Sequence, residues 1–395
     1  MQKVYLDHCA TTPLDSRVLA VMIPYLTENY GNASSVHLFG QQARAAVDKA
    51  RRQVASLIGG AAKEVVFTSG GTEANNLAIR GVCEAASHGR HIITSAIEHP
   101  SVRGPIEEFE KNGWDVTRLP VYEDGIVRVE DVGAAIRPDT VLISVMLANN
   151  EIGTIQPIAE IGAFVRETRG AGRKHLRFHT DAVQAGGRIP IDVEALGCDM
   201  LTLSAHKLYG PKGMGALFIR RGVRILAQQV GGHQERERRA GTESVANIVG
   251  FGAAAEFAKK EMNDRNEHVQ GLRDRFESEI EKQIDNIVFN GKRDQRLPHV
   301  SNISFRFIEG EGLLIHLDLQ GIAVSTGSAC SSGTLEPSPV IRALGRNEEL
   351  ARGAIRFSFG KDNLDNDVDY VLEVLPRAVE SLRNLSPLQR EPVAI

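Results

Sequence analysis

The fold of this chain is decided in the stretch Asp199-Met200-Leu201-Thr202-Leu203-Ser204-Ala205-His206-Lys207-Leu208-Tyr209-Gly210-Pro211-Lys212-Gly213. The apolar run from Met200 to Leu203 predicts a short buried strand, and the glycines and proline that follow prevent a regular element from starting at once. Lys207 is therefore expected at a strand end. Burial disfavours the ammonium form, lowers the pKa of such an amine and makes it a nucleophile toward an aldehyde. A surface lysine at the start of a loop would give the same pattern.

Length and composition are those of an ordinary globular protein. The 395 residues suffice for two domains, because a single core rarely grows beyond about 250 to 300 residues. The 46 basic and 50 acidic residues give a net charge of -4, so no overall field favours nucleic acid or a membrane as a partner. The first residues form no apolar signal core, and no run reaches the roughly 20 apolar residues of a membrane span. We therefore expect a cytoplasmic protein.

The four cysteines are far apart in the sequence and form no Cys-x-x-Cys pair for a metal or a redox couple; they are Cys9, Cys83, Cys198 and Cys330. Three of them are expected to pack as small apolar side chains.

Apolar strand-like runs alternate with helical patterns from about Lys63 to about Gly252, which predicts a mostly parallel sheet covered by helices. Ahead of this region, apolar residues at helical spacing predict a helix from Gly40 to Ile58. Near the end of the chain, a helical pattern from Asp365 to Leu385 contains Pro376, which is expected to kink or restart that helix.

Two domains are expected. The helical pattern continues beyond Gly252 toward Ile280 while the charge density rises, so the division is placed there. Residues 15–259 would form a large cofactor-binding domain, and residues 260–395 a smaller domain that residues 1–14 join.

Polar groups that could bind a ligand follow the predicted strands. After the strand Glu64–Thr68, the turn around Gly71 and Thr72 opens a helix, so its N–H groups and the Thr72 hydroxyl could hold a phosphate. Most such turns are plain connections. His99 follows the apolar segment His91–Ile97, where an imidazole could stack on a flat ring or move a proton, or be an ordinary loop residue.

An amide and a carboxylate follow the next strands. Asn150 comes shortly after Val141–Leu147, where it suits planar polar recognition or a turn. Asp181 ends a further strand, with Gln184 three residues on. Its carboxylate would need a cationic partner, for which a protonated pyridine nitrogen is one candidate, or it would cap a helix that starts just after it.

Each of these signals is weak by itself, but all of them fall where strands end. Ligands of open α/β sheets bind in the crevice at the carboxyl ends of the strands. A phosphate cradle, a stacking imidazole, a carboxylate and an amine together form the complement of pyridoxal phosphate. We therefore expect this cofactor, bound covalently to Lys207.

Motifs along nearly the whole chain carry a family resemblance. They are Tyr5-Leu6-Asp7 through Ala10-Thr11-Thr12-Pro13, Gly31-Asn32 with Ser34-Ser35 and His37, Thr68-Ser69-Gly70-Gly71-Thr72-Glu73, Glu98-His99-Pro100, Asn149-Asn150-Glu151-Ile152-Gly153, His179-Thr180-Asp181-Ala182-Val183-Gln184 and Ser204-Ala205-His206-Lys207. The chain resembles the fold type I pyridoxal-phosphate enzymes, and among them the cysteine desulfurases of the NifS/IscS group. The resemblance implies an α/β fold: a large domain with a mostly parallel seven-stranded sheet and a smaller α+β C-terminal domain.

The same resemblance implies roles for the residues at the strand ends. Lys207 would form the Schiff base with the cofactor, and His99 would stack on its ring. Asp181 would pair with the pyridine nitrogen, and Gln184 with the phenolic oxygen. Asn150 would touch cofactor or substrate. The phosphate would be held by Gly71, Thr72, Ser204 and His206.

Two further matches bear on the reaction. The segment Ser325–Pro337 resembles the sulfur-accepting loop of the family, with Cys330 as nucleophile. A cysteine among serine, glycine and alanine lacks the apolar surroundings of a structural thiol, although such a residue can also be a buried loop cysteine. Arg356 matches the arginine that grips the substrate carboxylate, for which a guanidinium fork is suited; a salt-bridged strand arginine is the alternative.

Gly231 to Glu243 resembles the segment that crosses a homodimer interface, where Thr242 would reach the phosphate bound by the partner subunit. The chain departs from the family pattern at Ala33, Cys9, Glu237 and a connection, Arg166 to Lys174, that looks longer than usual.

The resemblance implies removal of sulfur from L-cysteine, giving L-alanine and a persulfide on Cys330. An iron–sulfur scaffold or another sulfur-acceptor protein would take that sulfur. The long loop around Cys330 favours this activity over a selenocysteine lyase. A selenocysteine lyase or an aminotransferase on the same fold and a non-catalytic sulfur-transfer scaffold remain alternatives, although a scaffold needs neither Lys207 nor Cys330.

Overall fold

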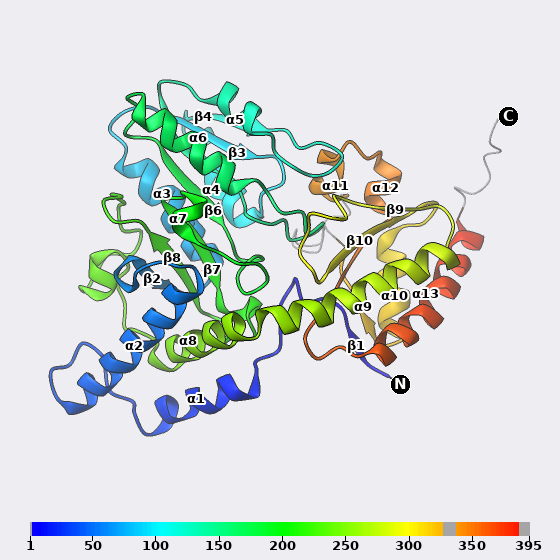
Figure 1. The fold of residues 1–395 in the computed structure, drawn as a ribbon, viewed down its shortest axis with the longest axis horizontal. Coiled ribbons are helices and arrows are strands. Elements are labelled where there is room, and N and C mark those ends of the chain that lie inside the picture. The colour runs from blue at the N-terminus through cyan, green and yellow to red at the C-terminus, as the bar shows by residue number, and fades with distance from the viewer. Residues whose placement is uncertain (1, 327–336, 387–395) are drawn as a thin grey trace.

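The chain folds around a large central sheet (Figure 1). A computed structural model describes residues 2–326 and 337–386, and in it this sheet has seven strands in the order β2-β8-β7-β6-β5-β3-β4. Only β8 runs antiparallel to its neighbours, so the expected mostly parallel sheet is confirmed. The strands are β2 (Val65–Thr68), β3 (His91–Ser95), β4 (Asp115–Leu119), β5 (Thr140–Ser144), β6 (Arg177–Asp181), β7 (Met200–Ser204) and β8 (Gly215–Ile219).

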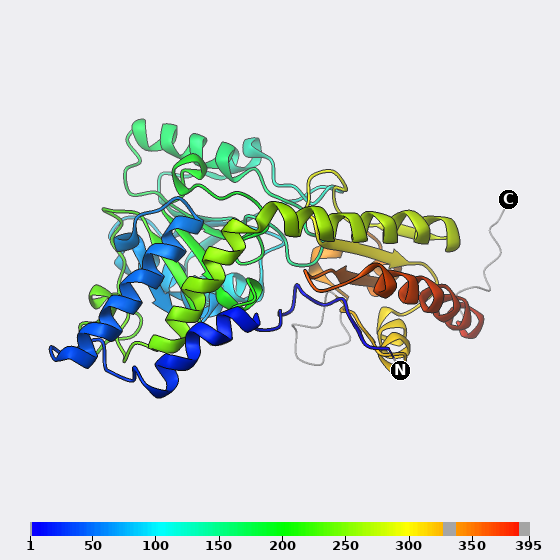
Figure 2. The same ribbon diagram turned by 60° about the horizontal axis from the view of Figure 1, so that its bottom comes forward.

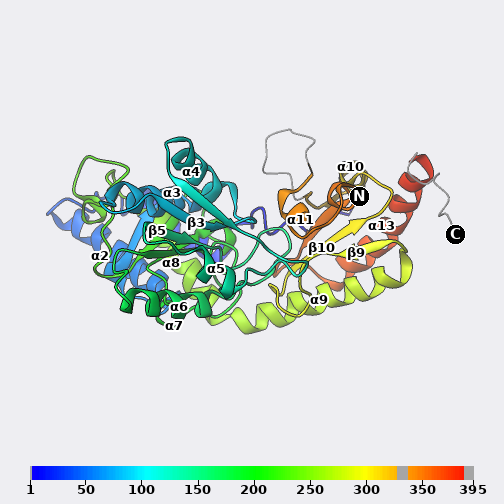
Figure 3. The same ribbon diagram turned by 90° about the horizontal axis from the view of Figure 1, so that it is seen from above.

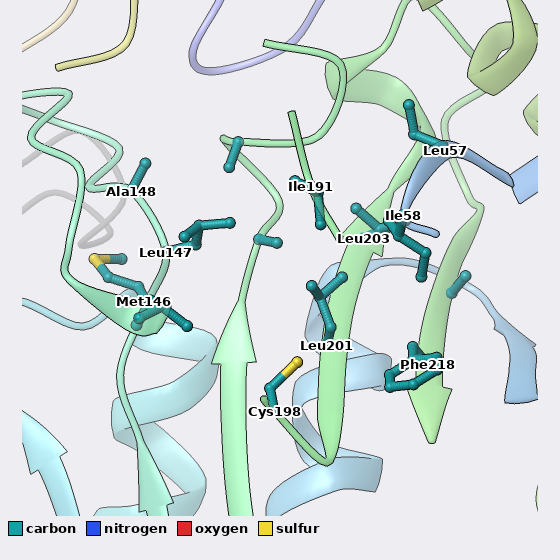
Figure 4. Packing of buried hydrophobic residues seen from close by; sticks show 14 of the residues in the cluster. Leu57, Ile58, Met146, Leu147, Ala148, Ile191, Cys198, Leu201, Leu203 and Phe218 are labelled. Atoms are coloured by element: carbon teal, nitrogen blue, oxygen red, sulfur yellow. The ribbon is translucent and has the colours of Figure 1, made fainter. Parts of the chain in front are cut away.

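Alternation along the strands sends side chains into two hydrophobic cores. In β2, Val65 and Phe67 belong to one core and Val66 to the other, as a period of two requires. Leu201, Leu203 and Phe218 gather on the first face, as Figure 4 shows. Helices α3 (Gly71–Ala85) and α4 (Pro100–Lys111) pack on the other face.

The remaining helices of this part lie mainly on the first face or beside it; they are α1 (Ser16–Thr27), α2 (Leu38–Leu57), α5 (Val129–Ala135), α6 (Ile158–Gly170), α7 (Val193–Leu196) and α8 (Val245–Lys260). Helix α2 fits the helix expected from Gly40 to Ile58. Helix α6 extends to Gly170, so the first part of the segment Arg166 to Lys174 is helical, and its greater length relative to the family stays a prediction. Cys9, Cys83 and Cys198 are buried, as their apolar surroundings predicted.

A third core gathers most of the C-terminal elements with the first residues of the chain. It is built from β1 (Val4–Tyr5), α9 (Met262–Gln283), β9 (Ile287–Phe289), β10 (Val300–Phe305), α10 (Gly310–Leu319), β11 (Ile322–Ala323), β12 (Ala354–Ser358) and α13 (Asp365–Leu385). Helices α11 (Pro339–Ala343) and α12 (Glu348–Arg352) instead bury Val340, Ile341 and Ala351 in the first core. Helix α9 runs on from α8 into this second lobe, as Figures 1 and 2 show. We propose that the two lobes are the two expected domains.

Two further features concern the helices. Helix α13 continues through Pro376 instead of ending there, because Val371, Leu375 and Val379 on either side of the proline are buried in the core of the C-terminal lobe. Within residues 2–326 and 337–386, no helix is long and apolar enough to cross a membrane.

Candidate active site

A cavity of about 280 Å³ lies where the strands of the large sheet end and the C-terminal lobe begins. Figure 3 views this junction from above, with the large sheet on one side and β10 on the other. The cavity wall includes residues of both lobes and of the N-terminal segment. Of the residues expected from the sequence, it brings together Gly71, Thr72, His99, Asn150, Asp181, Gln184, Ser204, His206, Lys207 and Arg356.

One end of the cavity is the first turn of α3. Among the described residues, no side chain caps this helix. Its first N–H groups, at the cavity wall, are therefore available to bind an anion. Gly71 lies close to the strand ends, since a Cβ there would stand 3.0 Å from Val183 Cγ2. Thr72 and Ser204 add hydroxyl groups to the same wall. This end of the cavity fits a phosphate monoester.

His206 lies at the same end, in the turn after β7. Its Nδ1 is 3.1 Å from the hydroxyl of Thr11. Burial, together with the charges of Lys207 and Lys212, lowers the pKa of His206 to about 4. The ring is therefore a neutral hydrogen-bonding group at physiological pH.

Asp181 is held by two donors. Its Oδ2 accepts from Asn75 Nδ2 at 2.7 Å, and its Oδ1 accepts from the backbone N–H of Val183 at 2.9 Å. The second bond closes a turn, and no helix begins between Asp181 and α7, so the alternative expectation that Asp181 caps a helix starting just after it is wrong. A carboxylate that is 6% exposed and points toward a cavity suits a protonated ring nitrogen.

His99 is joined to Asp181 through two polar residues that the sequence analysis missed. Asn75 Nδ2 donates to Ser101 Oγ at 2.8 Å, and that hydroxyl lies 2.7 Å from His99 Nδ1. The N–H of Ser101 also donates to Nδ1, so the neutral ring carries its proton on Nε2. Burial lowers the pKa of His99, and Lys207 lowers it further, while Asp181 raises it. Asn75 is fully buried, but no local pattern in the sequence indicates this, so the network could not be found before the structure.

Lys207 ends the short 3-10 turn that follows β7. Its Nζ donates to the backbone carbonyl of Cys9 and, at 2.7 Å, to that of Ala10. Gln184 Nε2 donates to the same Cys9 carbonyl at 3.0 Å. The N-terminal segment therefore orients the amine toward the cavity from the side of the C-terminal lobe.

Arg356, on β12, forms the wall opposite the sheet. Its Nη1 donates to the Asn150 carbonyl at 2.8 Å, and its Nη2 donates to Asp7 Oδ1 at 2.6 Å. Its Nε is buried and has no hydrogen-bond partner among the described residues. A buried guanidinium with an unsatisfied N–H at a cavity wall fits a carboxylate ligand.

Two expected site residues are not part of this cavity as described. Cys330 lies outside the described residues. Ser325, just before that segment, exchanges backbone hydrogen bonds with Arg356 at 3.2 and 2.7 Å. Thr242 lines a separate cavity of about 180 Å³ with Ser69 and Arg239.

The residues in the cavity fit pyridoxal phosphate. The uncapped helix end matches the phosphate, Asp181 the ring nitrogen, and the amine of Lys207 the aldehyde. His99 is neutral and offers its ring face or its Nε2 proton. The phosphate, the ring nitrogen and the aldehyde of the cofactor would each find a protein group of matching chemistry in this cavity.

Comparisons with known proteins agree with this geometry. Residues 4–371 match the family model described as aminotransferase class-V. Two proteins named cysteine desulfurase IscS are similar: that of Dictyoglomus turgidum is 50% identical over 391 residues, 99% of this chain and 98% of that protein. That of Methanosarcina thermophila is 49% identical over 386 residues, 98% of this chain and 94% of that protein.

Two solved structures are also similar. A NifS-like protein superposes with a TM-score of 0.90 at 36% identity, covering 96% of this chain and 100% of that one. SspA in complex with cysteine superposes with a TM-score of 0.80 at 34% identity, covering 92% of this chain and 100% of that one.

Proposed function

The chain belongs to the class-V aminotransferase family, and on this premise we propose that it is a cysteine desulfurase. The enzyme depends on pyridoxal phosphate, takes L-cysteine as substrate and releases L-alanine, leaving a persulfide on Cys330. One observation carries this choice of reaction. Arg356, on the cavity wall, is hydrogen-bonded through its backbone to Ser325, which shortly precedes the segment of Cys330. An aminotransferase would not need a cysteine in the segment that follows Ser325.

Different cavity residues bind the cofactor and the substrate carboxylate. When bound, pyridoxal phosphate supplies an aldehyde for amines and a protonated ring that withdraws electrons from the α-carbon of the substrate. Asp181 stabilises the positive charge of that ring. Arg356 binds the substrate carboxylate through its Nε–H and a remaining Nη–H, while Asn150 and Asp7 hold the guanidinium in place.

Proton transfers are assigned to the amine and the imidazole. The amine of Lys207 takes the α-proton of the substrate, and the carbonyls of Cys9 and Ala10 accept hydrogen bonds from the resulting ammonium. His99 holds a proton on Nε2, because Ser101 occupies Nδ1. That proton can be donated to the substrate as its carbon–sulfur bond breaks.

The sulfur step belongs to Cys330. Its thiolate attacks the sulfur of the substrate, and the S–S bond forms as the Cβ–S bond of the substrate breaks. The carbon takes the electron pair and then a proton, and alanine leaves. The persulfide sulfur is then available to an acceptor thiol.

A spectrum and a product assay test this function together. Addition of L-cysteine to the purified holoenzyme should shift its visible cofactor band and yield alanine and sulfide in equal amounts with a reducing thiol. Cys330→Ala should keep the band and its shift but form no alanine. Cys83→Ala, which removes a buried thiol on α3, is the matched control and should turn over. Alanine from Cys330→Ala at the wild-type rate, or a keto acid as product, would contradict the assignment.

A homodimer is part of the proposal. Large apolar side chains of α1, of the start of α2 and of the connection between them are exposed, which is unusual for a face that meets only water; they are Leu19, Ile23, Leu26, Tyr30, Val36, Leu38 and Phe39. Thr242 lines a cavity other than that of Lys207. A second copy covering the apolar face would account for the exposed apolar side chains and for the position of Thr242 away from the cavity of Lys207. Sedimentation should give a dimer, and Leu26→Asp with Phe39→Asp should give monomers; a monomeric, fully active wild type would refute the proposal.

The destination of the sulfur is also a proposal. We expect an iron–sulfur scaffold or another sulfur-acceptor protein in the cytoplasm, which fits the naming of the similar proteins as IscS. Incubation of the persulfide enzyme with candidate acceptors, followed by mass spectrometry of their thiols, tests it.

A further inference from the structure

Glu151 is a buried carboxylate to which the proposed mechanism gives no role. It follows Asn150, the cavity residue whose carbonyl accepts from Arg356, and is 6% exposed. Its backbone is fixed on both sides: its N–H donates to Asn149 Oδ1 at 2.8 Å, and its carbonyl accepts from Asn302 Nδ2 at 3.2 Å. The direction of the side chain is therefore set by the surrounding structure.

The carboxylate of Glu151 points to Ser338. The hydroxyl of Ser338 donates to Glu151 Oε2 at 2.5 Å, and Ser338 Oγ accepts from the N–H groups of Val340 and Ile341. Ser338 thus caps α11, and Glu151 orients the cap. Ser338 stands two residues after 336, at the C-terminal end of the segment that contains Cys330.

The other end of that segment is tied to the same wall. Ser325 and Arg356 exchange backbone hydrogen bonds, and Arg356 donates to the carbonyl of Asn150. Asn150 is covalently joined to Glu151. The ends of the segment and the arginine at the cavity wall therefore form one connected hydrogen-bonded frame.

We propose that Glu151 is a positioning residue for sulfur transfer: through Ser338 it holds the end of the Cys330 segment against the wall that binds the substrate carboxylate. This inference rests on the proposed function. Cys330 lies in the chain between Ser325 and Ser338, the two residues that the frame holds, so loosening Ser338 should slow the sulfur step; a misplacement of reacting groups by about 1 Å costs on the order of 100-fold in rate. Binding of the substrate by Arg356 does not require Ser338.

The charge state of Glu151 determines which variants are informative. Burial raises its pKa to about 7, while the hydrogen bond from Ser338 and the charges of Arg356 and Arg103 lower it. The carboxyl is therefore partly neutral at physiological pH. Glutamine keeps the oxygen that accepts from Ser338 and resembles the neutral form, whereas alanine removes the hydrogen bond.

The test uses the full-length holoenzyme with Glu151→Ala, Glu151→Gln and Asn347→Ala. The last is the matched control, because Asn347 caps the neighbouring helix α12 and does not line the cavity. Alanine formation from L-cysteine gives kcat and KM, and mass spectrometry after a single turnover gives the persulfide on Cys330. We expect Glu151→Ala to lower kcat and persulfide formation by at least about tenfold, with KM within about twofold. Glu151→Gln should recover most of the rate, and Asn347→Ala should lose none.

Wild-type kcat in Glu151→Ala, an equal loss in Asn347→Ala, or a loss in KM alone would overturn the inference. A wild type that makes no alanine would instead refute the proposed function. If Glu151→Ala does not fold, Ser338→Ala and Ser338→Thr replace it. Threonine keeps the hydroxyl, so Ser338→Thr must be faster than Ser338→Ala, and equal rates would overturn the inference.

Discussion

Replacing Arg356 by lysine keeps a positive charge at the cavity wall but removes the planar fork. The guanidinium donates hydrogen bonds to the Asn150 carbonyl at 2.8 Å and to Asp7 at 2.6 Å. Its Nε–H and one further Nη–H remain as donors for a substrate carboxylate. A lysine ammonium has three donors in a compact group, so it can give the substrate carboxylate one bond while serving Asp7. Arg356→Lys therefore removes one charge-assisted hydrogen bond to the substrate.

The magnitude follows from that count. A hydrogen bond to a charged group contributes about 1.5 to 3 kcal/mol, and about 1.4 kcal/mol corresponds to tenfold in affinity. A loss of about 2 kcal/mol predicts a Kd for L-cysteine raised about 30-fold. The change belongs in binding, because Lys207 and Asp181 keep their own hydrogen-bond partners.

The assay is a titration of the visible cofactor band with L-cysteine in a Cys330→Ala background, where turnover does not deplete the substrate. Arg103→Lys is the matched control, since Arg103 carries a charge near the site but is paired with Glu107 at 3.3 Å. The Kd of Arg103→Lys for L-cysteine should stay within about threefold of the Kd measured with Cys330→Ala alone. A Kd for Arg356→Lys that is equally unchanged would refute the role of the fork.

Three further outcomes are expected. Asp181→Asn removes the negative charge beside the ring nitrogen and should lower alanine formation about 100-fold or more while some cofactor absorbance remains; wild-type turnover would contradict this. Gly360→Ala would put a Cβ 2.1 Å from His8 Cε1 and should cost about 2 to 3 kcal/mol, read as a lower urea midpoint; an unchanged midpoint would contradict the close packing. Burial lowers the pKa of His179 to about 3, so between pH 6.5 and that value the unfolded chain binds a proton that the folded chain does not, and stability falls as pH falls, by up to about 1.4 kcal/mol per pH unit. Urea midpoints at several pH values should show a shallower slope for His179→Gln than for the wild type, and equal slopes would contradict it.

Much of the sheet and of its ligand edge was predictable from the sequence. Strands of a parallel sheet share one carboxyl edge, so residues such as His99, Asp181 and Lys207 meet wherever the strands are identified. Asn75 and Ser101 were missed because their function depends on bonds between side chains 26 and 106 residues apart, which no local pattern records.

The C-terminal lobe was less predictable. Arg356 could be assigned only through the family resemblance, because nothing in a strand arginine tells which cavity it will face. Pro376 was expected to disturb α13, but burial of its apolar neighbours holds the helix together. The roles of Cys330 and Thr242 stay predictions.

The contacts of the N-terminal segment set the order in which the site can form during synthesis. Asp7 can pair with Arg356 only after a further 349 residues have been synthesised. The carbonyl of Cys9 can accept from Lys207 only after a further 198 residues. Contacts of such sequence separation form late and slowly. A nascent chain on the ribosome can therefore fold the large sheet before β12, which carries Arg356, has been synthesised. Until β12 has emerged and its Ser358 has bonded to Leu6 and Cys9, the amine of Lys207 lacks its mature surroundings.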